Sequence, residues 1–330
     1  MLKGIVIAVV LLVVILAGYF VISYVVPVDL GDRVVSVIVE PGDSFAGVAS
    51  RLLDNGVVRS GVMLRLPARW RGIDKHLTPG RYDFTGKNSC RSVLDKLERA
   101  DFVNIRVTIY EGAPIWKVAS ILAERMEVDS AEIVEKNSDE ELLARLGVPS
   151  LEGYLFPQTY FWPWRTPSVT MLEDMVAMFR AQTDSLWPDT VHNNLSREDV
   201  ITLASIVEAE ALINDEMPMI ASVYHNRIRR RMKLDADPTV IYGLGGLERP
   251  LNRRDLERPG PYNTYLNRGL PPSPINSPGL ASIRAVLYPA ESDYLFFVAD
   301  GTGKHRFSRT NAEHNRARRE IRRLNQNSGS

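Results

Sequence analysis

Two glutamates, Glu208 and Glu210, stand near the end of a segment whose apolar spacing predicts a helix, Ser196–Leu212. A carboxyl beside apolar neighbours loses solvation in its charged form, so its pKa rises and it can hold a proton to donate near neutral pH. That is the property a general acid needs. On a helical wheel of about 100° per residue, the two glutamates fall on opposite flanks of the apolar stripe, with Glu208 somewhat nearer its centre. Periodicity alone does not choose between them.

The helix that carries the two glutamates has a clear predicted start. Ser196 and Asp199 have the spacing of a capping box, in which each side chain accepts a backbone N–H of the first turn. The apolar stripe that follows would bury one side of the helix. Without further motifs, both glutamates could equally be boundary residues paired with arginines. The stripe comprises Val200, Leu203, Ala204, Val207 and Ala211.

The segments around and after this helix resemble a known family. They are LASIVEAEA (203–211), IASVYHNRI (220–228), LDADPTVIYGLG (234–245), PYNTYLNRGLPPSPINSPG (261–279) and YLFFVADGTGKHRFSRTNAEHN (294–315). Their order and length closely resemble the MltG/YceG-like endolytic murein transglycosylases, and LEGYLFPQTY (151–160) fits the same pattern. The resemblance covers almost the whole chain.

The resemblance implies roles for individual residues. The catalytic glutamate is the one that follows Ser-Ile-Val, Glu208, and Glu210 is its neighbour. The sequence departs from the family where Gln158 replaces an Asp of many relatives, and where Ala209 and Ala211 flank Glu210 in place of polar residues. The substrate-binding residues that the resemblance implies are Asn226, Asp237, Tyr262, Asn263, Thr264 and Tyr265.

The family's reaction is a non-hydrolytic cut of the β-1,4 bond between N-acetylmuramic acid and N-acetylglucosamine. Glu208 would protonate the leaving oxygen and then take the proton of the muramyl C6 hydroxyl, which closes a 1,6-anhydro ring. Because the nucleophile belongs to the substrate, one acid suffices. The implied partners are peptidoglycan glycan strands and cell-wall synthases, and the implied role is to terminate nascent strands. No cofactor is expected.

Gly4–Val26 is an uncharged apolar stretch, long enough to cross a hydrocarbon core of about 30 Å as a helix. A cleaved signal peptide would have a shorter apolar region and a small-residue cleavage site. Lys3 precedes the stretch, and Asp29 and Asp32 follow it, which favours an inside position for the short end. We therefore expect a single-pass protein of the inner (cytoplasmic) membrane, with its catalytic domain on the periplasmic side.

The segments 35–52 and 105–122 resemble each other at a constant offset of 70 residues. In both, an alternating strand pattern runs into a glycine turn and then a helix-period segment. Ser44 can cap a first helix over Phe45–Asn55, and a second unit follows with a strand at Gly80–Phe84. These units resemble LysM modules, which bind peptidoglycan; the alternative is a plain α/β spacer.

The fold class predicted from these observations is α+β, with one N-terminal transmembrane helix, a LysM-like α/β subdomain and a mixed α+β catalytic domain. The rival to an enzyme is a non-catalytic, membrane-tethered peptidoglycan-binding scaffold, and a second rival is a hydrolase that uses water. The predicted parts are a cytoplasmic end at 1–3, a transmembrane helix at 4–26, a linker at 27–34, a LysM-like glycan-binding region at 35–112, a catalytic transglycosylase domain at 113–325 and a tail at 326–330.

Composition excludes other classes of function. Forty basic residues balance forty acidic ones, so no overall field draws the chain to nucleic acid. Cys90 is the only cysteine, which rules out an intramolecular disulfide. His305 and His314 lack a nearby carboxylate cluster in the sequence, so no metal site is expected. The aromatic segment Leu151–Trp164 could stack on sugar rings or bury a seam between domains.

Overall fold

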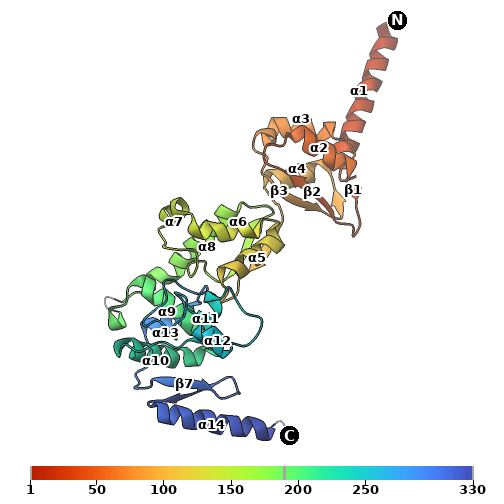
Figure 1. Ribbon diagram of the computed structural model, residues 1–330. Helices are drawn as coiled ribbons and strands as arrows, with labels where there is room; N and C mark the ends of the chain where they lie inside the picture. Colours follow the sequence, from red (N-terminus) through yellow and green to blue (C-terminus); the bar gives the residue numbers. More distant parts are fainter. Residues whose placement is uncertain (1, 189–190, 329–330) are drawn as a thin grey trace. The chain divides into compact units, whose positions relative to one another are not determined.

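The computed structural model describes residues 2–188 and 191–328, apart from the side chains of residues 2–6, 8, 9, 192 and 325–328 (Figure 1). Residue 1 of the predicted cytoplasmic end and residues 329–330 of the predicted tail lie outside this description. The chain is mixed α+β, as predicted, and forms two compact units. The first comprises Met1–Ile105 and Phe161–Thr166, and the second Arg106–Tyr160 and Pro167–Ser330. The division falls between residues 105 and 106, whereas the sequence favours one between 112 and 113.

In the first unit, the apolar N-terminal stretch forms one continuous helix, α1 (Leu2–Val25). Near its end Ser23 is buried, and the Cys90 thiol donates to the Ser23 carbonyl at 3.1 Å. Burial raises the pKa of Cys90 to about 11, so the thiol stays protonated. Among the described residues, no helix combines the length and the apolarity needed to cross a membrane, and the span at 4–26 stays a prediction.

The rest of the first unit is a small sheet covered by helices. β2 (Val35–Val39) pairs antiparallel with β3 (Gly80–Phe84). The predicted strand at Gly80–Phe84 is confirmed, and β2 lies where the alternating pattern of 35–52 begins. The helix predicted after Ser44 is also confirmed, because Ser44 accepts the N–H of Gly47 at 3.2 Å. The remaining elements are α2 (Phe45–Asp54), α3 (Val62–Arg71), α4 (Cys90–Glu98) and the short pair β1 (Val28–Asp29) and β4 (Lys87–Asn88).

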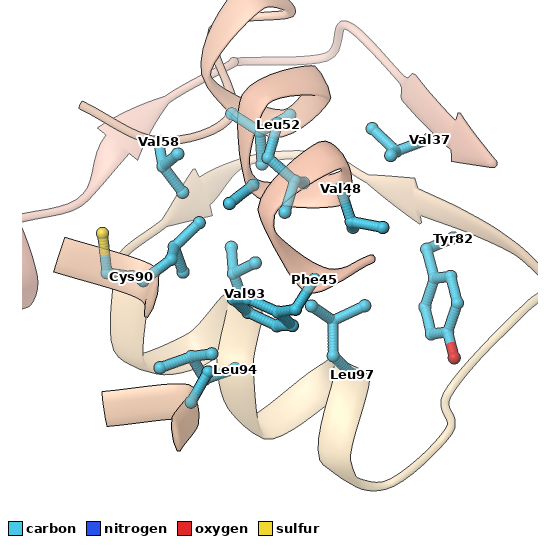
Figure 2. Packing of buried hydrophobic residues seen from close by; sticks show 14 of the residues in the cluster. Val37, Phe45, Val48, Leu52, Val58, Tyr82, Cys90, Val93, Leu94 and Leu97 are labelled. Carbon is cyan, nitrogen blue, oxygen red and sulfur yellow. The ribbon is translucent and has the colours of Figure 1, made fainter. Parts of the chain in front are cut away.

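Figure 2 shows the core of this unit, in which apolar side chains of the strands and helices interlock. Val37 and Tyr82 come from the sheet, and Val48 and Leu52 from α2. Leu97 from α4 closes the cluster. The alternation of the strands and the helical spacing of α2 and α4 therefore serve one shared core.

The second unit is mainly helical. α9 (Arg197–Glu210) packs against α13 (Leu280–Leu287) and α10 (Met217–Arg229). Its other helices are α5 (Ile115–Met126), α6 (Ser130–Glu135), α7 (Glu140–Leu146), α8 (Ser168–Thr183), α11 (Asp237–Gly243), α12 (Arg253–Glu257) and α14 (Asn311–Ser328). Its strands β7 (Phe296–Ala299) and β8 (His305–Ser308) form a hairpin against α14. The strands β5 (Asn104–Thr108) and β6 (Thr159–Pro163) pair with each other, and each has residues in both units.

The predicted start of α9 is confirmed. The Ser196 hydroxyl accepts the N–H of Asp199 at 3.1 Å, and the Asp199 carboxylate accepts the N–H of Ser196 at 3.0 Å. From Val200 to Val207 every side chain of α9 is buried, so the helix is enclosed on all sides. The burial ends where the two glutamates begin, which brings both carboxyls to the rim of a rigid core.

The aromatic segment 151–164 is mostly buried. Gly153 adopts a φ of +89°, and an added Cβ would lie 2.4 Å from Pro274 and 3.1 Å from Ile201, so only glycine fits there. Phe161, by contrast, is 61% exposed. Most rings of the segment therefore stabilise the fold. The buried rings are those of Tyr154, Phe156, Tyr160 and Trp162.

Candidate active site

A cavity of about 510 Å³ lies beside the last turn of α9, within the second unit. Glu210 lines it, and so do Asp237 and Tyr265 of the predicted substrate-binding set. These three residues come from segments that are far apart in the sequence. The cavity therefore brings a carboxyl of the α9 pair together with two motifs of the predicted site.

The Glu210 carboxyl is buried, and the Tyr224 hydroxyl of α10 donates to it at 3.1 Å. Burial raises the pKa of Glu210 to about 7. The hydrogen bond from Tyr224 opposes that rise, the negative charge of Asp237 adds to it, and the positive charge of Arg227 opposes it. Near neutral pH this carboxyl can both give and accept a proton.

Asp237 and Tyr265 form a pair across the cavity wall. Asp237 is the first residue of α11, and it accepts a hydrogen bond from the Tyr265 hydroxyl at 2.6 Å. The Asp237 side chain is exposed, and Tyr265 is half-buried. Their polar atoms are fixed in position and still accessible from the cavity, which suits them to bind hydroxyl or amide groups.

Arg227 frames the same cavity from within the core. Arg227 lies in the last turn of α10, within an arginine-rich run, yet it is only 7% exposed. Its guanidinium donates to the carbonyls of Leu295 at 2.6 Å and Leu234 at 2.7 Å, and to the Asp235 carboxylate at 3.1 Å. These bonds tie α10 to the residue before β7 and to the loop before α11, so Arg227 has mainly a structural role.

The Glu208 side chain contacts the start of α13. Its carboxylate accepts the N–H of Gly279, at the start of α13, at 2.9 Å, and a Cβ added at Gly112 would lie 3.5 Å from its Cγ. Burial raises the pKa of Glu208, the bonds from Gly279 and Ser282 oppose the rise, and the charge of Glu111 adds to it. Among the described residues, Glu208 does not line the 510 Å³ cavity.

The other predicted substrate-binding residues hold loops together. Asn226 donates to the carbonyls of Ser292 and Tyr294 at 2.8 and 3.0 Å. Asn263 donates to the carbonyls of Leu256 and Arg258 at 2.9 and 2.8 Å. Both asparagines are buried and turned into the fold. The motif residues therefore divide into a set at the cavity and a set that shapes it.

Thr264 and Tyr262 also belong to the shaping set. Thr264 is 1% exposed, and its hydroxyl accepts the N–H of Ala236, directly before Asp237, at 3.0 Å. The Tyr262 hydroxyl lies 2.6 Å from that of Ser273. Thr264 thus fixes the backbone that presents Asp237, whereas Tyr262 ties two loops to each other.

Sequence reasoning missed one wall of the cavity. α14 contributes Asn311, His314, Asn315 and Arg318, and Tyr224 of α10 also went unnoticed as the hydrogen-bond donor to Glu210. The four α14 positions have the spacing i, i+3, i+4 and i+7, which puts them on one face of a helix. That spacing can be read from the sequence of 311–318, although nothing in it shows which segment the face contacts.

The histidines take up other partners. The ring Nδ1 of His305 lies 2.8 Å from the Glu216 carboxylate, and the His314 ring stacks on Phe296 with centroids 5.4 Å apart. In the described part of the chain, no three side chains of His, Cys, Asp or Glu are grouped as metal ligands would be.

Comparisons with known proteins cover nearly the whole chain. The model of the YceG-like family matches residues 37–320. An endolytic murein transglycosylase of Bacillus subtilis is 31% identical over 314 residues, which cover 88% of this chain and 86% of that protein. An endolytic murein transglycosylase of Streptococcus pneumoniae serotype 2 is 27% identical over 338 residues, covering 91% of this chain and 61% of that longer protein.

A crystal structure of a YceG-like protein from Listeria monocytogenes aligns with a TM-score of 0.59 and 28% identity, covering 86% of this chain and 98% of that one. The segment that the family model matches includes every residue of the cavity. The agreement of sequence and fold over this length shows that the chain belongs to the YceG-like family.

Proposed function

We propose that the protein is a peptidoglycan lytic transglycosylase that cuts the β-1,4 bond between N-acetylmuramic acid and N-acetylglucosamine and leaves a 1,6-anhydro end. The observation that carries the proposal is the cavity in which Glu210, with a pKa near 7, lies with Asp237 and Tyr265. The relatives named endolytic murein transglycosylases, which match most of the chain, support the same activity.

The reaction needs one group that gives a proton and takes one back. The protonated carboxyl donates to the glycosidic oxygen as that bond breaks, and the resulting carboxylate accepts the proton of the muramyl C6 hydroxyl. The C6 oxygen then bonds to C1, and no water is consumed. Because the hydroxyl is already part of the substrate, its effective concentration is high. Asp237 and Tyr265 suit the placing of polar groups of the sugar as positive charge develops at C1.

The geometry favours Glu210 as the proton donor. Its side chain lines the cavity, and a pKa near 7 suits a group that changes protonation twice per turnover. Glu208 stays the donor predicted by resemblance. Its raised pKa fits that role too, but its carboxylate is engaged by the N-terminus of α13.

Paired substitutions test the assignment. Glu210→Gln keeps the shape and removes the titrating proton, and we expect a loss of about 10²–10⁴-fold in the cleavage of purified sacculi. Glu208→Gln is the matched variant, and we expect a smaller loss because a glutamine oxygen can still accept the Gly279 N–H. The reverse order of losses would make Glu208 the acid, and wild-type rates for both variants would show that neither glutamate is the acid. No cleavage by the wild type would favour the scaffold alternative.

The products distinguish transfer from hydrolysis. Mass spectrometry of the released muropeptides should find 1,6-anhydro ends, which are lighter by one water than the reducing ends that a hydrolase leaves. Reducing ends as the main product would support the water-using alternative with the same cavity.

We further propose that α1 anchors the protein in the inner membrane, with the catalytic domain on the periplasmic side. The support is the uncharged run at 4–26, of which 4–25 lies in one helix, with the side chains of Leu11 to Leu16 each 56–65% exposed. Exposed apolar side chains of this kind are stable in hydrocarbon. An anchored enzyme would meet new strands first, which agrees with a terminator role beside cell-wall synthases and with a LysM-like, glycan-binding first unit.

A further inference from the structure

The cavity beside Glu210 has two walls of different chemistry. One wall carries the carboxyls of Glu210, Asp235 and Asp237. The other is the α14 face, which carries a guanidinium, an imidazole and two amides. Residues on this α14 wall are Asn311, His314, Asn315 and Arg318.

Arg318 is the available cation of the α14 wall. Arg227 is also at the cavity, but its donors are taken up by Leu295, Leu234 and Asp235. Arg318 is exposed and forms no ion pair among the described residues, whereas Arg306 of the hairpin is paired with Glu320 of α14 at 2.9 Å. A guanidinium left free at a cavity is suited to bind a carboxylate.

The His314 ring lies near the positive charges of the cavity. Burial lowers the pKa of His314, and the charges of Arg318 and Arg227 lower it further, so the ring is neutral at pH 7. Its Nδ1 is buried without a hydrogen-bond partner in the described part of the chain. A neutral imidazole and the amides of Asn311 and Asn315 can donate hydrogen bonds beside Arg318 without adding charge.

We propose that the α14 wall binds a carboxylate of the muramyl residue, with Arg318 as its main contact, while the sugar faces Glu210. The proposal rests on the proposed transglycosylase function and adds that Arg318 selects strands that carry muramic acid. Muramic acid carries a lactyl group that ends either in a free carboxylate or in a peptide stem with carboxylates of its own. A polymer of N-acetylglucosamine carries neither, so Arg318 would separate peptidoglycan from neutral glycans.

The test uses the full-length protein in detergent with two substrates. One is uncrosslinked glycan with intact peptide stems, and the other is the same glycan stripped of stems by an amidase, which frees the lactyl carboxylate. The variants are Arg318→Gln, Arg318→Lys and the matched control Arg319→Gln, whose side chain is exposed on the same helix and is not at the cavity. Thermal unfolding of each variant checks that the fold is intact.

We expect Arg318→Gln to lower kcat/KM by about 10- to 100-fold, mainly through KM, as for the loss of a charge-assisted hydrogen bond. Arg318→Lys should keep part of the activity, and Arg319→Gln should match wild type. A loss confined to intact strands identifies a stem carboxylate as the contact, and a loss confined to stripped strands identifies the lactyl carboxylate. A chito-oligosaccharide should inhibit wild type and Arg318→Gln equally, since it has no carboxylate.

If Arg318→Gln equals Arg319→Gln on both substrates, the α14 wall does not bind a carboxylate, and the proposed function is unaffected. Stronger inhibition of wild type than of Arg318→Gln by the chito-oligosaccharide would also overturn the inference, because the contact would then be to a neutral sugar. Failure of wild type to cut either substrate would instead contradict the proposed function.

Discussion

The Glu210 carboxyl owes its chemistry to a balance of neighbours. Burial disfavours its charge, and the Tyr224 hydroxyl partly restores it, so the pKa lies near 7. A buried acid without such a donor would hold its proton too tightly to act as a base in the second half of the reaction. In the proposed reaction, this one hydroxyl on a neighbouring helix would let a single residue serve both halves.

This balance predicts the pH dependence of cleavage. The acid must be protonated to start the reaction, so kcat/KM should fall about tenfold per pH unit above a pKa near 7. Tyr224→Phe removes a bond that favours the carboxylate, so the pKa of Glu210 should rise and the alkaline limb should move to higher pH. Rates of strand cleavage measured from pH 5 to 9 would show it. A limb that stays in place in Tyr224→Phe would mean that another group controls it.

A second buried carboxyl, Glu152, should make stability depend on pH. It is 1% exposed, accepts the N–H of Ile115 at 3.1 Å, and burial raises its pKa from 4.5 to about 7. Between those values the folded chain binds more protons than the unfolded chain, so its contribution to the free energy of unfolding falls as pH rises. The fall amounts to roughly 3 kcal/mol at most.

Glu152→Gln should remove that dependence, since glutamine can still accept the Ile115 N–H. We expect the variant to be more stable than wild type at pH 8 and similar to it near pH 4.5, by thermal unfolding in detergent. Glu141→Gln, an exposed change on α7, is the control and should follow wild type at every pH. Parallel curves for Glu152→Gln and wild type would contradict the prediction.

At the scale of elements, α9 packs closely against Gly153, which lies outside the helix. Gly153 packs on Pro274 and Ile201, and Ile201 belongs to α9. We expect Gly153→Ala to lower the free energy of unfolding by about 3 kcal/mol, because it combines a strained positive φ with overpacking. Gly245→Ala has a similar φ of +79° and open space at its Cβ, so it should cost only about 1 kcal/mol. Equal losses in urea unfolding would show that the packing contact does not matter.

The elements themselves could largely be predicted from the sequence, because their signals are local. Ser44 and Ser196 have the positions of N-caps and predict helix starts. Alternation of apolar and polar residues in 35–39 and 80–84 predicts the two strands. The orientation of the two glutamates could not be predicted in this way. It depends on which distant segment covers each flank of α9: Gly279 covers the Glu208 side, and the Asp237 loop and α14 enclose the other. A wheel contains no information about those partners.

The same limit applies to the motif residues. Asn226, Asp237, Asn263 and Tyr265 all stand in family motifs, and only Asp237 and Tyr265 reach the cavity. The asparagines hold backbone carbonyls at 2.8–3.0 Å, a role that a motif cannot distinguish from substrate binding. The two asparagines are buried, whereas Asp237 and Tyr265 are not. Because burial depends on the assembled fold, the sequence motif alone does not predict it.

At the scale of the whole molecule, the proposed anchor fixes which side of the membrane the cavity faces. Lys3 precedes the apolar run, and Asp29 and Asp32 follow it, so the chain after the run should be outside the cytoplasm. A reporter enzyme that works only outside the cytoplasm, fused after Ser330, should therefore be active. An inactive reporter on a stable, membrane-located fusion would reverse the orientation. The same fusion with residues 1–31 removed is the control and should be inactive.

The α14 wall is the last part of the cavity to be synthesised. Because proteins are made and exported from the N-terminus, Glu210 emerges about a hundred residues before Arg318. A chain halted or clipped before Asn311 would have its acid but lack one side of the binding site. Such a fragment would bind its substrate poorly, so an incomplete copy would cleave peptidoglycan slowly. Under the proposed function, the order of the residues along the chain delays cleavage of peptidoglycan until α14 has been made.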